Sequence, residues 1–280
     1  MKTQTKLVGL KPTLLMAQMK ADFTKSDIKI YEYILANKEK VLYHSLTEMA
    51  EACVVAEATL LRFFRKLDYK GFQDFKFMLA QELSLTTIDA VENTYVDKVK
   101  NNVIQVITDT AAVVEEDLLD QAIIKIAASE DLVIFGIGSS GIAALDMQNR
   151  LMRIGKNSSI ITDSHFQMMR AASMTEKTVV IAVSLTGSTK DIVDAVSASK
   201  SNGATVIALT SYTKSPLTKF ADLVLLSSSK ESPLDSGSLI SKISQLFLID
   251  LICTGLALKN EQEAKVIQLK ISENTANKLY

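Results

Sequence analysis

The sequence predicts two folded parts, an all-α part at the front of the chain and an α/β part with a parallel sheet behind it. In the first 85 residues, apolar side chains recur at helical spacing. From residue 131 onward, five short apolar runs alternate with amphipathic helices, a pattern typical of a parallel sheet covered on both faces. The chain has 280 residues, of which 48% are hydrophobic. That length and composition suit one to three globular domains.

The front part is predicted to consist of consecutive short helices. The first spans residues 26–37, and the second spans 45–53 with Ser45 as its N-cap and Glu48 three residues later, which is a capping-box pattern. The third covers residues 57–67. Two short helices joined by a tight turn, the second of them basic, describe a helix-turn-helix.

The helix over 57–67 carries two stripes of different character. Leu60, Phe63 and Leu67 recur at i, i+3 and i+7 and should face the core. The second stripe is basic and hydroxyl-bearing, and such side chains reach base edges and phosphates of DNA. A solvated helix face explains the same spacing, so both interpretations stay open here. The candidate nucleic-acid contacts are Thr59, Arg62, Arg65 and Lys66.

Charge is divided weakly between the two parts. Residues 1–85 carry 13 Lys and Arg against 10 Asp and Glu, whereas the rest carries 18 against 22. This is compatible with a nucleic-acid-binding head on an acidic body but does not establish one. Residues 83–101 are rich in Thr, Asp and Glu and are predicted to form a connector that becomes helical in its second half. The predicted domains are therefore 1–83, a connecting segment at 84–110, and 111–280.

The rear part is predicted to contain five strands, at 132–135, 159–162, 179–183, 206–209 and 223–226. The first is followed by a glycine- and serine-rich loop from Gly136 to Gly141, which formally matches GxGxxG. Asp163 lies 22 residues past Gly141, where a dinucleotide-binding fold needs its ribose-binding acid. The same loop suits any phosphate, because glycines let the backbone approach and helix-start amides point at the anion. This motif alone does not choose its ligand.

A second polar loop follows the third strand and favours a phosphate site of another kind. Residues 184–190 read SLTGSTK and again stand between a strand and a helix. Their hydroxyls and backbone amides can donate several hydrogen bonds to one phosphate group. A serine-rich turn that caps a helix is the structural alternative. From both loops, the candidate effector-binding residues are Gly138, Ser139, Ser140, Ser184, Thr186, Gly187, Ser188 and Thr189.

Two stretches resemble known families. Residues 23–83, most specifically EATLLRFFRKL followed by KGFQDFK, look like the N-terminal domain of RpiR-family bacterial regulators. Residues 131–258, through FGIGSSG, SLTGSTKDIV and LISKISQLFLIDL, look like a sugar isomerase (SIS) domain. The resemblance implies a helix-turn-helix domain whose recognition helix is 57–67, and an SIS domain with a five-stranded parallel sheet flanked by helices.

The resemblance also implies residue roles. Phosphate contacts of the SIS family fall on Ser139, Ser140, Ser184, Thr186 and Thr189. Three positions depart from the family patterns: Ala56 replaces a Ser cap, Asp68 replaces a Gly after the recognition helix, and Thr186 replaces a Ser.

We therefore expect a DNA-binding transcriptional regulator of sugar metabolism, not an enzyme, whose operator binding is modulated by a phosphosugar effector. The alternatives are a phosphosugar isomerase with an accessory helical domain, for which His165 and Glu231 are the candidate bases, and a nicotinamide-dependent dehydrogenase. The expected partners are operator DNA, the effector and a second copy, with residues 238–258 as the candidate subunit contact. No cofactor, metal or membrane segment is expected, and the location should be cytoplasmic. Cys53 and Cys253 are predicted to be buried thiols.

Overall fold

The computed structural model describes residues 11–84, 94–228 and 239–276. Contacts within the chain divide the described residues into two units, the first ending at residue 84 and the second beginning at residue 94. Each unit has its own hydrophobic core. The two predicted folds, all-α followed by α/β, are confirmed.

The described residues of the first unit form helices joined by short turns. Aromatic side chains form the centre of its core: the ring of Phe64 stacks on that of Phe75 with 4.6 Å between centroids, and on that of Phe72 with 5.3 Å. Phe72 and Phe75 are therefore core residues of this unit. Its elements are α1 (Pro12–Met19), η1 (Lys20–Asp22), α2 (Lys25–Ala36), α3 (Lys38–Leu42), α4 (Leu46–Ala52), α5 (Glu57–Lys66) and α6 (Phe72–Ser84).

Local sequence explains where these helices begin. Ser45 accepts a hydrogen bond from the backbone N–H of Glu48, whose side chain in turn accepts one from the N–H of Ser45, so the predicted capping box of α4 is confirmed. A second box forms at Thr24 and Asp27, so α2 begins at Lys25 rather than at residue 26. By contrast, Ala56 precedes α5 without any side-chain cap.

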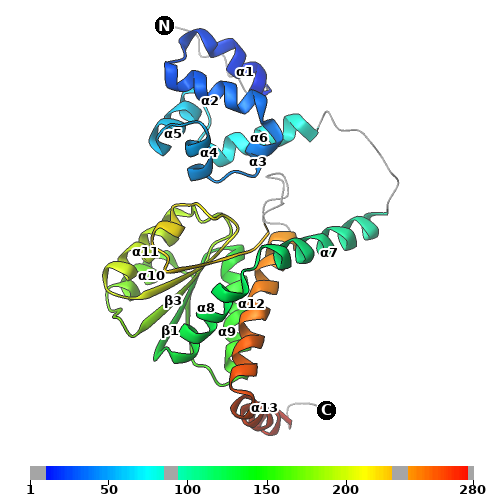
Figure 1. Ribbon diagram of the computed structural model, residues 1–280, viewed down its shortest axis with the longest axis vertical. Helices are drawn as coiled ribbons and strands as arrows, with labels where there is room; N and C mark the ends of the chain where they lie inside the picture. Colours follow the sequence, from blue (N-terminus) through cyan, green and yellow to red (C-terminus); the bar gives the residue numbers. More distant parts are fainter. Residues whose placement is uncertain (1–10, 85–93, 229–238, 277–280) are drawn as a thin grey trace. The chain divides into compact units, whose positions relative to one another are not determined.

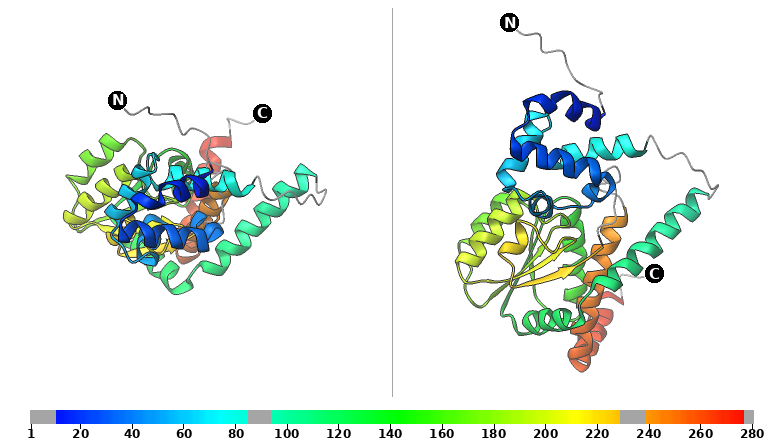
Figure 2. Two further views of the ribbon diagram at one scale, coloured as in Figure 1. Left: turned by 90° about the horizontal axis from the view of Figure 1, so that it is seen from above. Right: turned by 45° about the horizontal axis from the view of Figure 1, so that its top comes forward.

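The second unit is a doubly covered parallel sheet with strand order β2-β1-β3-β4-β5. Helices α8, α9 and α12 pack on one face, and α10 and α11 on the other (Figures 1 and 2). The strands are β1 (Asp131–Gly136), β2 (Ser159–Ile161), β3 (Thr178–Val183), β4 (Thr205–Thr210) and β5 (Leu223–Leu226). The helices are α7 (Tyr95–Val113), α8 (Glu116–Ala128), α9 (Ser139–Arg153), α10 (Ser164–Ala171), α11 (Lys190–Ser201), η2 (Leu217–Lys219), α12 (Leu239–Lys259) and α13 (Glu261–Thr275).

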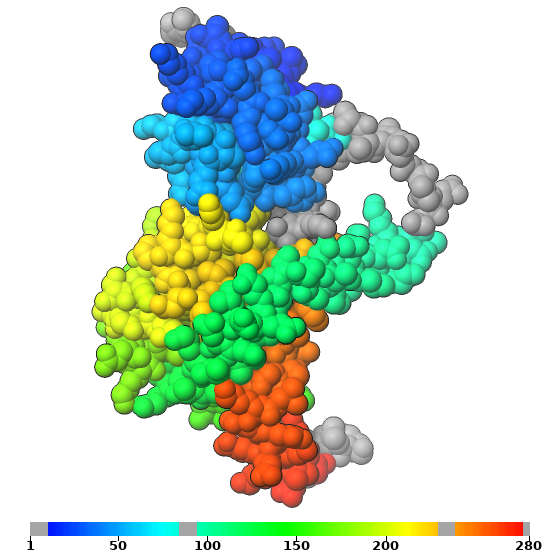
Figure 3. Space-filling model, viewed as in Figure 1, coloured from blue at the N-terminus to red at the C-terminus, as the bar shows by residue number. Residues whose placement is uncertain are grey.

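Helix α12 is long and apolar enough to cross a membrane by length and composition. In this fold it is a core helix, because Leu248, Ile249, Ile252 and Leu256 are buried in the cluster that covers one face of the sheet. It also packs against α7, which crosses it in the space-filling view (Figure 3). The buried face of this segment is therefore accounted for within the unit.

Candidate functional site

The two polar loops of the second unit leave the sheet at neighbouring strand ends. Gly136, the last residue of β1, is the registered partner of Val183, the last residue of β3. The connection from β1 leads to β2 on one side, whereas β3 lies on the other side of β1. Parallel sheets bind ligands at such a reversal of strand order, in the crevice outside the carboxyl ends of the strands. Both candidate loops therefore begin at the topological switch point.

Glycines in the first loop allow a close approach of strand and helix. A Cβ on Gly136 would lie 2.8 Å from the carbonyl oxygen of Ser140, so a side chain there requires a shift of the backbone. Gly138 has φ of 58°, the left-handed region that favours glycine, and a Cβ on this residue would meet no atom within 4 Å. The loop thus packs tightly at its base and is open at its tip.

The second loop is held in shape by neighbouring residues. Gly187 has φ of 59°, and a Cβ there would lie 2.2 Å from Oγ of Ser215. Its carbonyl accepts a hydrogen bond from the N–H of Leu217, and its own N–H donates to the carbonyl of Ser184. Gly187 therefore shapes the turn, and its close packing leaves no room for a ligand on the Cβ side.

The candidate hydroxyls differ in whether they already make hydrogen bonds within the protein. Thr186 Oγ1 accepts from the N–H of Ser188, 3.3 Å away, and Ser188 Oγ donates to the carbonyl of Thr186. Ser140 Oγ accepts from Nε2 of Gln245 at 3.0 Å. The hydroxyls of the remaining three candidates make no hydrogen bond to any residue that the structure describes, and they are Ser139, Ser184 and Thr189.

The helices that follow these loops begin without a side-chain cap. Gly138 precedes α9 and Thr189 precedes α11, and neither supplies a side-chain acceptor to the first turn. In α10, by contrast, the carboxylate of Asp163 accepts from the N–H of Phe166. The first N–H groups of a helix lack intrahelical partners, and the helix dipole there favours an anion. Two such helix starts at one switch point match the binding of a phosphate group.

Asp163 thus caps α10, and His165, a candidate base, lies in the first turn of that helix. His165 lines a groove of about 240 Å³ together with Ser164, Met168, Asp191 and Asp194. Two carboxylates make this groove unsuited to the phosphate itself. The other candidate base, Glu231, lies outside the described residues.

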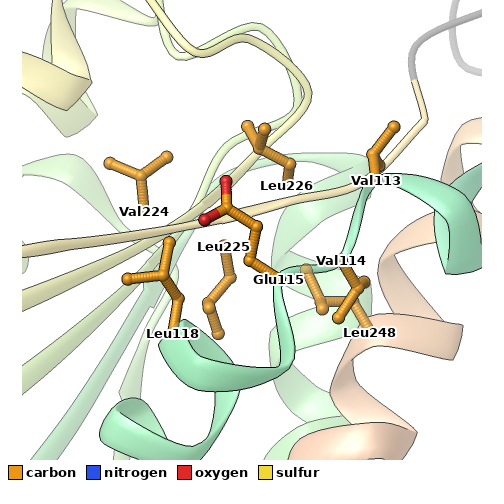
Figure 4. A pocket seen from close by; sticks show the side chains of 8 residues that line it. All are labelled: Val113, Val114, Glu115, Leu118, Val224, Leu225, Leu226 and Leu248. Atoms are coloured by element: carbon orange, nitrogen blue, oxygen red, sulfur yellow. The ribbon is translucent and has the colours of Figure 1, made fainter.

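A separate small pocket of about 10 Å³ lies where α7 passes into α8, against β5 and α12. Its eight lining side chains are aliphatic except for Glu115, the one charged group among them (Figure 4). A carboxylate in aliphatic surroundings repels a phosphate, so this pocket is not a candidate effector site. Within the described ranges, no cluster of three His, Cys, Asp or Glu side chains suits a metal ion.

In the first unit, α5 exposes the guanidinium groups of Arg62 and Arg65. Nη2 of Arg62 donates to Oγ1 of Thr59 at 3.0 Å, which confirms that these two residues share a stripe. Lys66 is differently placed: its Nζ lies 3.0 Å from Oδ2 of Asp27 and donates to the carbonyl of Asp22. The basic stripe is thus divided between two exposed arginines and a lysine with partners inside the unit.

Beside the helix-turn-helix lies a buried polar cluster that periodicity did not single out. Lys76 of α6 is 3% exposed and donates to the carbonyl of His44, just before α4. Burial lowers the pKa of Lys76 to about 8, although Glu48 opposes this shift. Nε2 of His44 lies 2.8 Å from the hydroxyl of Tyr33, and burial lowers the pKa of His44 as well. This cluster joins α6 to the start of α4.

The predicted cysteines are both buried and free. Burial raises the pKa of Cys53 to about 11 and that of Cys253 to about 12, so neither is a reactive thiolate at neutral pH.

Comparisons with known proteins agree with this architecture. Residues 12–86 match the helix-turn-helix domain of the rpiR family, and residues 125–255 match the SIS domain. An uncharacterized HTH-type transcriptional regulator of Clostridium perfringens is 33% identical over 90% of this chain and 94% of its own length. The HTH-type transcriptional regulator RpiR of Escherichia coli K12 is 28% identical over 92% of this chain and 90% of its own length.

Among solved structures, the Vibrio vulnificus NanR protein complexed with ManNAc-6P is 27% identical, with a TM-score of 0.87 over 96% of this chain and 99% of that one. The relatives from Clostridium perfringens and Escherichia coli are transcriptional regulators, the class that the sequence predicted, and not isomerases or dehydrogenases. The chain belongs to the RpiR family of helix-turn-helix transcriptional regulators, with its SIS domain in the second unit.

Proposed function

We propose that this regulator of sugar metabolism binds a phosphosugar at the switch point of its SIS domain and that the bound effector changes the affinity of α5 for operator DNA. The observation that carries the proposal is the pairing, at adjacent strand ends, of two uncapped helix starts with three hydroxyls that have no partner among the described residues. The relative complexed with ManNAc-6P supports the same ligand class. An effector acts this way only if it binds the two DNA-binding states with unequal affinity.

Within the site, we propose that Ser139, Ser184 and Thr189 donate hydroxyl protons to the phosphate, while Ser140, Thr186 and Ser188 contribute from hydroxyls that already have one partner. Gly138 and Gly187 give the loops their shape. We divide the hydroxyls in this way because Ser140, Thr186 and Ser188 already make hydrogen bonds within the protein.

A thermal-shift screen against hexose, pentose and amino-sugar phosphates, ManNAc-6P included, tests the ligand class. A compound at 100 times its dissociation constant stabilises the chain by about 2.7 kcal/mol. Ser184→Ala should lose this shift and the effector response but retain DNA binding. The matched control is Ser201→Ala, at the far end of α11, which should respond as the wild type does. Isomerisation of a sugar phosphate by the purified chain would contradict the proposal.

For DNA, we propose that Thr59, Arg62, Arg65 and Lys66 form the operator-facing side of α5, with the two arginines as its freest groups. Arg62→Ala should weaken operator binding and leave phosphosugar binding intact. Lys29→Ala, an exposed cation on α2, is the matched control. The affinity for operator DNA should be measured at several salt concentrations, because contacts to DNA phosphates make this affinity fall steeply with salt. Equal loss of both activities in a folded Arg62→Ala variant would contradict separate sites.

We also propose that the regulator acts as a homodimer in the cytoplasm, where a twofold protein matches a palindromic operator. The predicted contact at 238–258 lies mostly in α12, whose buried side chains already pack within their own unit. Helix α7, however, exposes Tyr95, Val96 and Val99, which a second copy could cover. Sedimentation analysis of the wild type and of Val99→Asp tests this. A monomeric wild type would contradict it.

A further inference from the structure

One buried amide connects the candidate phosphate site to the core helix α12. Gln245 is 3% exposed, and its Nε2 donates to Oγ of Ser140, 105 residues earlier in the chain. Burying an amide is costly unless it is hydrogen-bonded, so this contact has a structural reason to be kept. It also joins α12 to the first turn of α9.

The buried face of α12 changes character along its length. Its first turns place Ser241, Ser244 and Gln245 in buried positions, whereas the following turns bury only aliphatic side chains and Cys253. The polar stretch therefore lies in the same part of the helix as the amide that reaches Ser140. If α12 only packed against the sheet, apolar residues would suffice along its whole buried face, as they do in its later turns.

The direction of the hydrogen bond matters for an anion. An amide NH₂ only donates, so the oxygen of Ser140 accepts and its own proton is free to point elsewhere. Ser140 stands beside Gly138, whose Cβ side is open. A hydroxyl held in this way offers its proton to a ligand oxygen, and it does so without first breaking a bond to a protein acceptor.

We propose that Gln245 is a positioning residue of the effector site, which fixes the hydroxyl of Ser140 as a hydrogen-bond donor to the phosphate. This inference rests on the proposed function of the switch-point loops. It assigns no ligand contact to Gln245 itself, which acts through Ser140.

A double-mutant cycle tests the inference in the full chain, with ManNAc-6P and the tightest-binding member of the sugar-phosphate panel as titrants. Gln245→Leu and Ser140→Ala should each weaken binding about tenfold, as expected for one hydrogen bond to a charged group. In the Ser140→Ala background, Gln245→Leu should cost no more than about twofold further. The matched control is Gln148→Leu. Gln148 lies farther along α9, and its side chain donates a 2.9 Å hydrogen bond to the carbonyl of Ser158.

A charge variant separates positioning from simple packing. In Gln245→Glu the carboxylate at pH 8 accepts from Ser140 and turns its proton away from the ligand. At pH 5.5 a protonated carboxyl can donate again, so the affinity relative to wild type at the same pH should recover. Packing and charge repulsion also recover on protonation, so the comparison is Gln245→Glu in the Ser140→Ala background. There positioning predicts no recovery at pH 5.5, because the effect on the ligand passes through the missing hydroxyl, whereas packing or repulsion predicts a recovery of the same size.

Two results would overturn the inference. One is an affinity of the Gln245→Leu variant for the sugar phosphate within twofold of that of the wild type. The other is a loss of affinity, when Gln245→Leu is added to Ser140→Ala, as large as the loss that Gln245→Leu causes in the wild type. If the wild type binds no sugar phosphate, or Ser184→Ala binds normally, the proposed function fails instead. Circular dichroism of each variant separates loss of binding from loss of fold.

Discussion

Nζ of Lys66, at the end of α5, lies 3.0 Å from Oδ2 of Asp27, in the first turn of α2. The side chain of Asp27 is 9% exposed and that of Lys66 is 33% exposed, so the pair is partly shielded from water. Burial by itself would raise the pKa of Asp27, but hydrogen bonds from Thr24 and Lys66 outweigh it and hold the pKa below its ordinary value. The contact thus fixes α5 to the rest of the first unit.

Lys66→Met should therefore destabilise the first unit, by about 1 kcal/mol, because it leaves a buried carboxylate without its cation. Arg62→Ala, which removes an exposed side chain, should change stability by less than about 0.5 kcal/mol. Since the folded state lowers the pKa of Asp27, its contribution is present above pH 4 and is lost as the pH falls below that value. Urea denaturation at pH 7 and pH 3.5 measures both effects.

The control for Lys66→Met is Lys70→Met, an exposed lysine just after α5. Equal stability of the Lys66→Met variant and the wild type at pH 7 would show that the ion pair contributes nothing to the fold.

Much of this fold could be predicted because it is encoded locally. The alternation of apolar runs and amphipathic helices located all five strands, and the pattern Ser45 to Glu48 located the start of α4. The two loops could be found because glycines and hydroxyls follow strands directly in the sequence. That they share one end of the sheet followed from the general geometry of parallel strands, and the registered pair Gly136 and Val183 confirms it.

Contacts between distant residues could not be predicted in this way. Lys66 and Asp27 are 39 residues apart, and Gln245 and Ser140 are 105 apart. Helical periodicity indicates which side of a helix is polar but not which partner meets it. Lys66 was therefore predicted as another member of the basic stripe, and nothing in the helical pattern marked Gln245 as a partner of Ser140.

Val54 lies in the turn between α4 and α5 with φ of 53°, a conformation that is costly for a β-branched residue. Its side chain is 76% exposed, so little packing is lost if it is removed. Val54→Gly should therefore stabilise the first unit by about 1 kcal/mol, which a thermal melt would detect. Val54→Ala is the control, because alanine keeps the strain and should gain much less. A lower melting temperature for Val54→Gly would show that the valine makes a stabilising contact.

Ala56 and Asp68, the two departures from the family pattern that flank α5, can be tested in the same way. Ala56→Ser should supply the missing acceptor for the first turn of α5 and stabilise the unit by about 0.5 to 2 kcal/mol. Asp68 has φ of 69°, so Asp68→Gly should also be stabilising, by less than Val54→Gly because Asp tolerates this conformation better than valine. Melting temperatures of the single and double variants measure both gains. A fall in melting temperature for Ala56→Ser would refute the capping argument.

The buried Lys76 should make the stability of the first unit depend on pH in the alkaline range. Burial lowers its pKa from 10.5 to about 8, so between these values the unfolded chain binds a proton that the folded chain has released. Stability should therefore rise as the pH increases above 8, by about 1 kcal/mol per pH unit at first. Burial raises the pKa values of Cys53 and Tyr69, which opposes this rise above pH 9.

The measurement that isolates Lys76 is the difference in free energy of unfolding between the wild type and Lys76→Met, from urea denaturation at pH 7.5, 8.5 and 9.5. The cysteine and tyrosine contributions cancel in this difference. A difference that does not change with pH would show that Lys76 stays charged in the folded chain throughout this range, because a folded lysine that had already lost its proton would still give a rising difference.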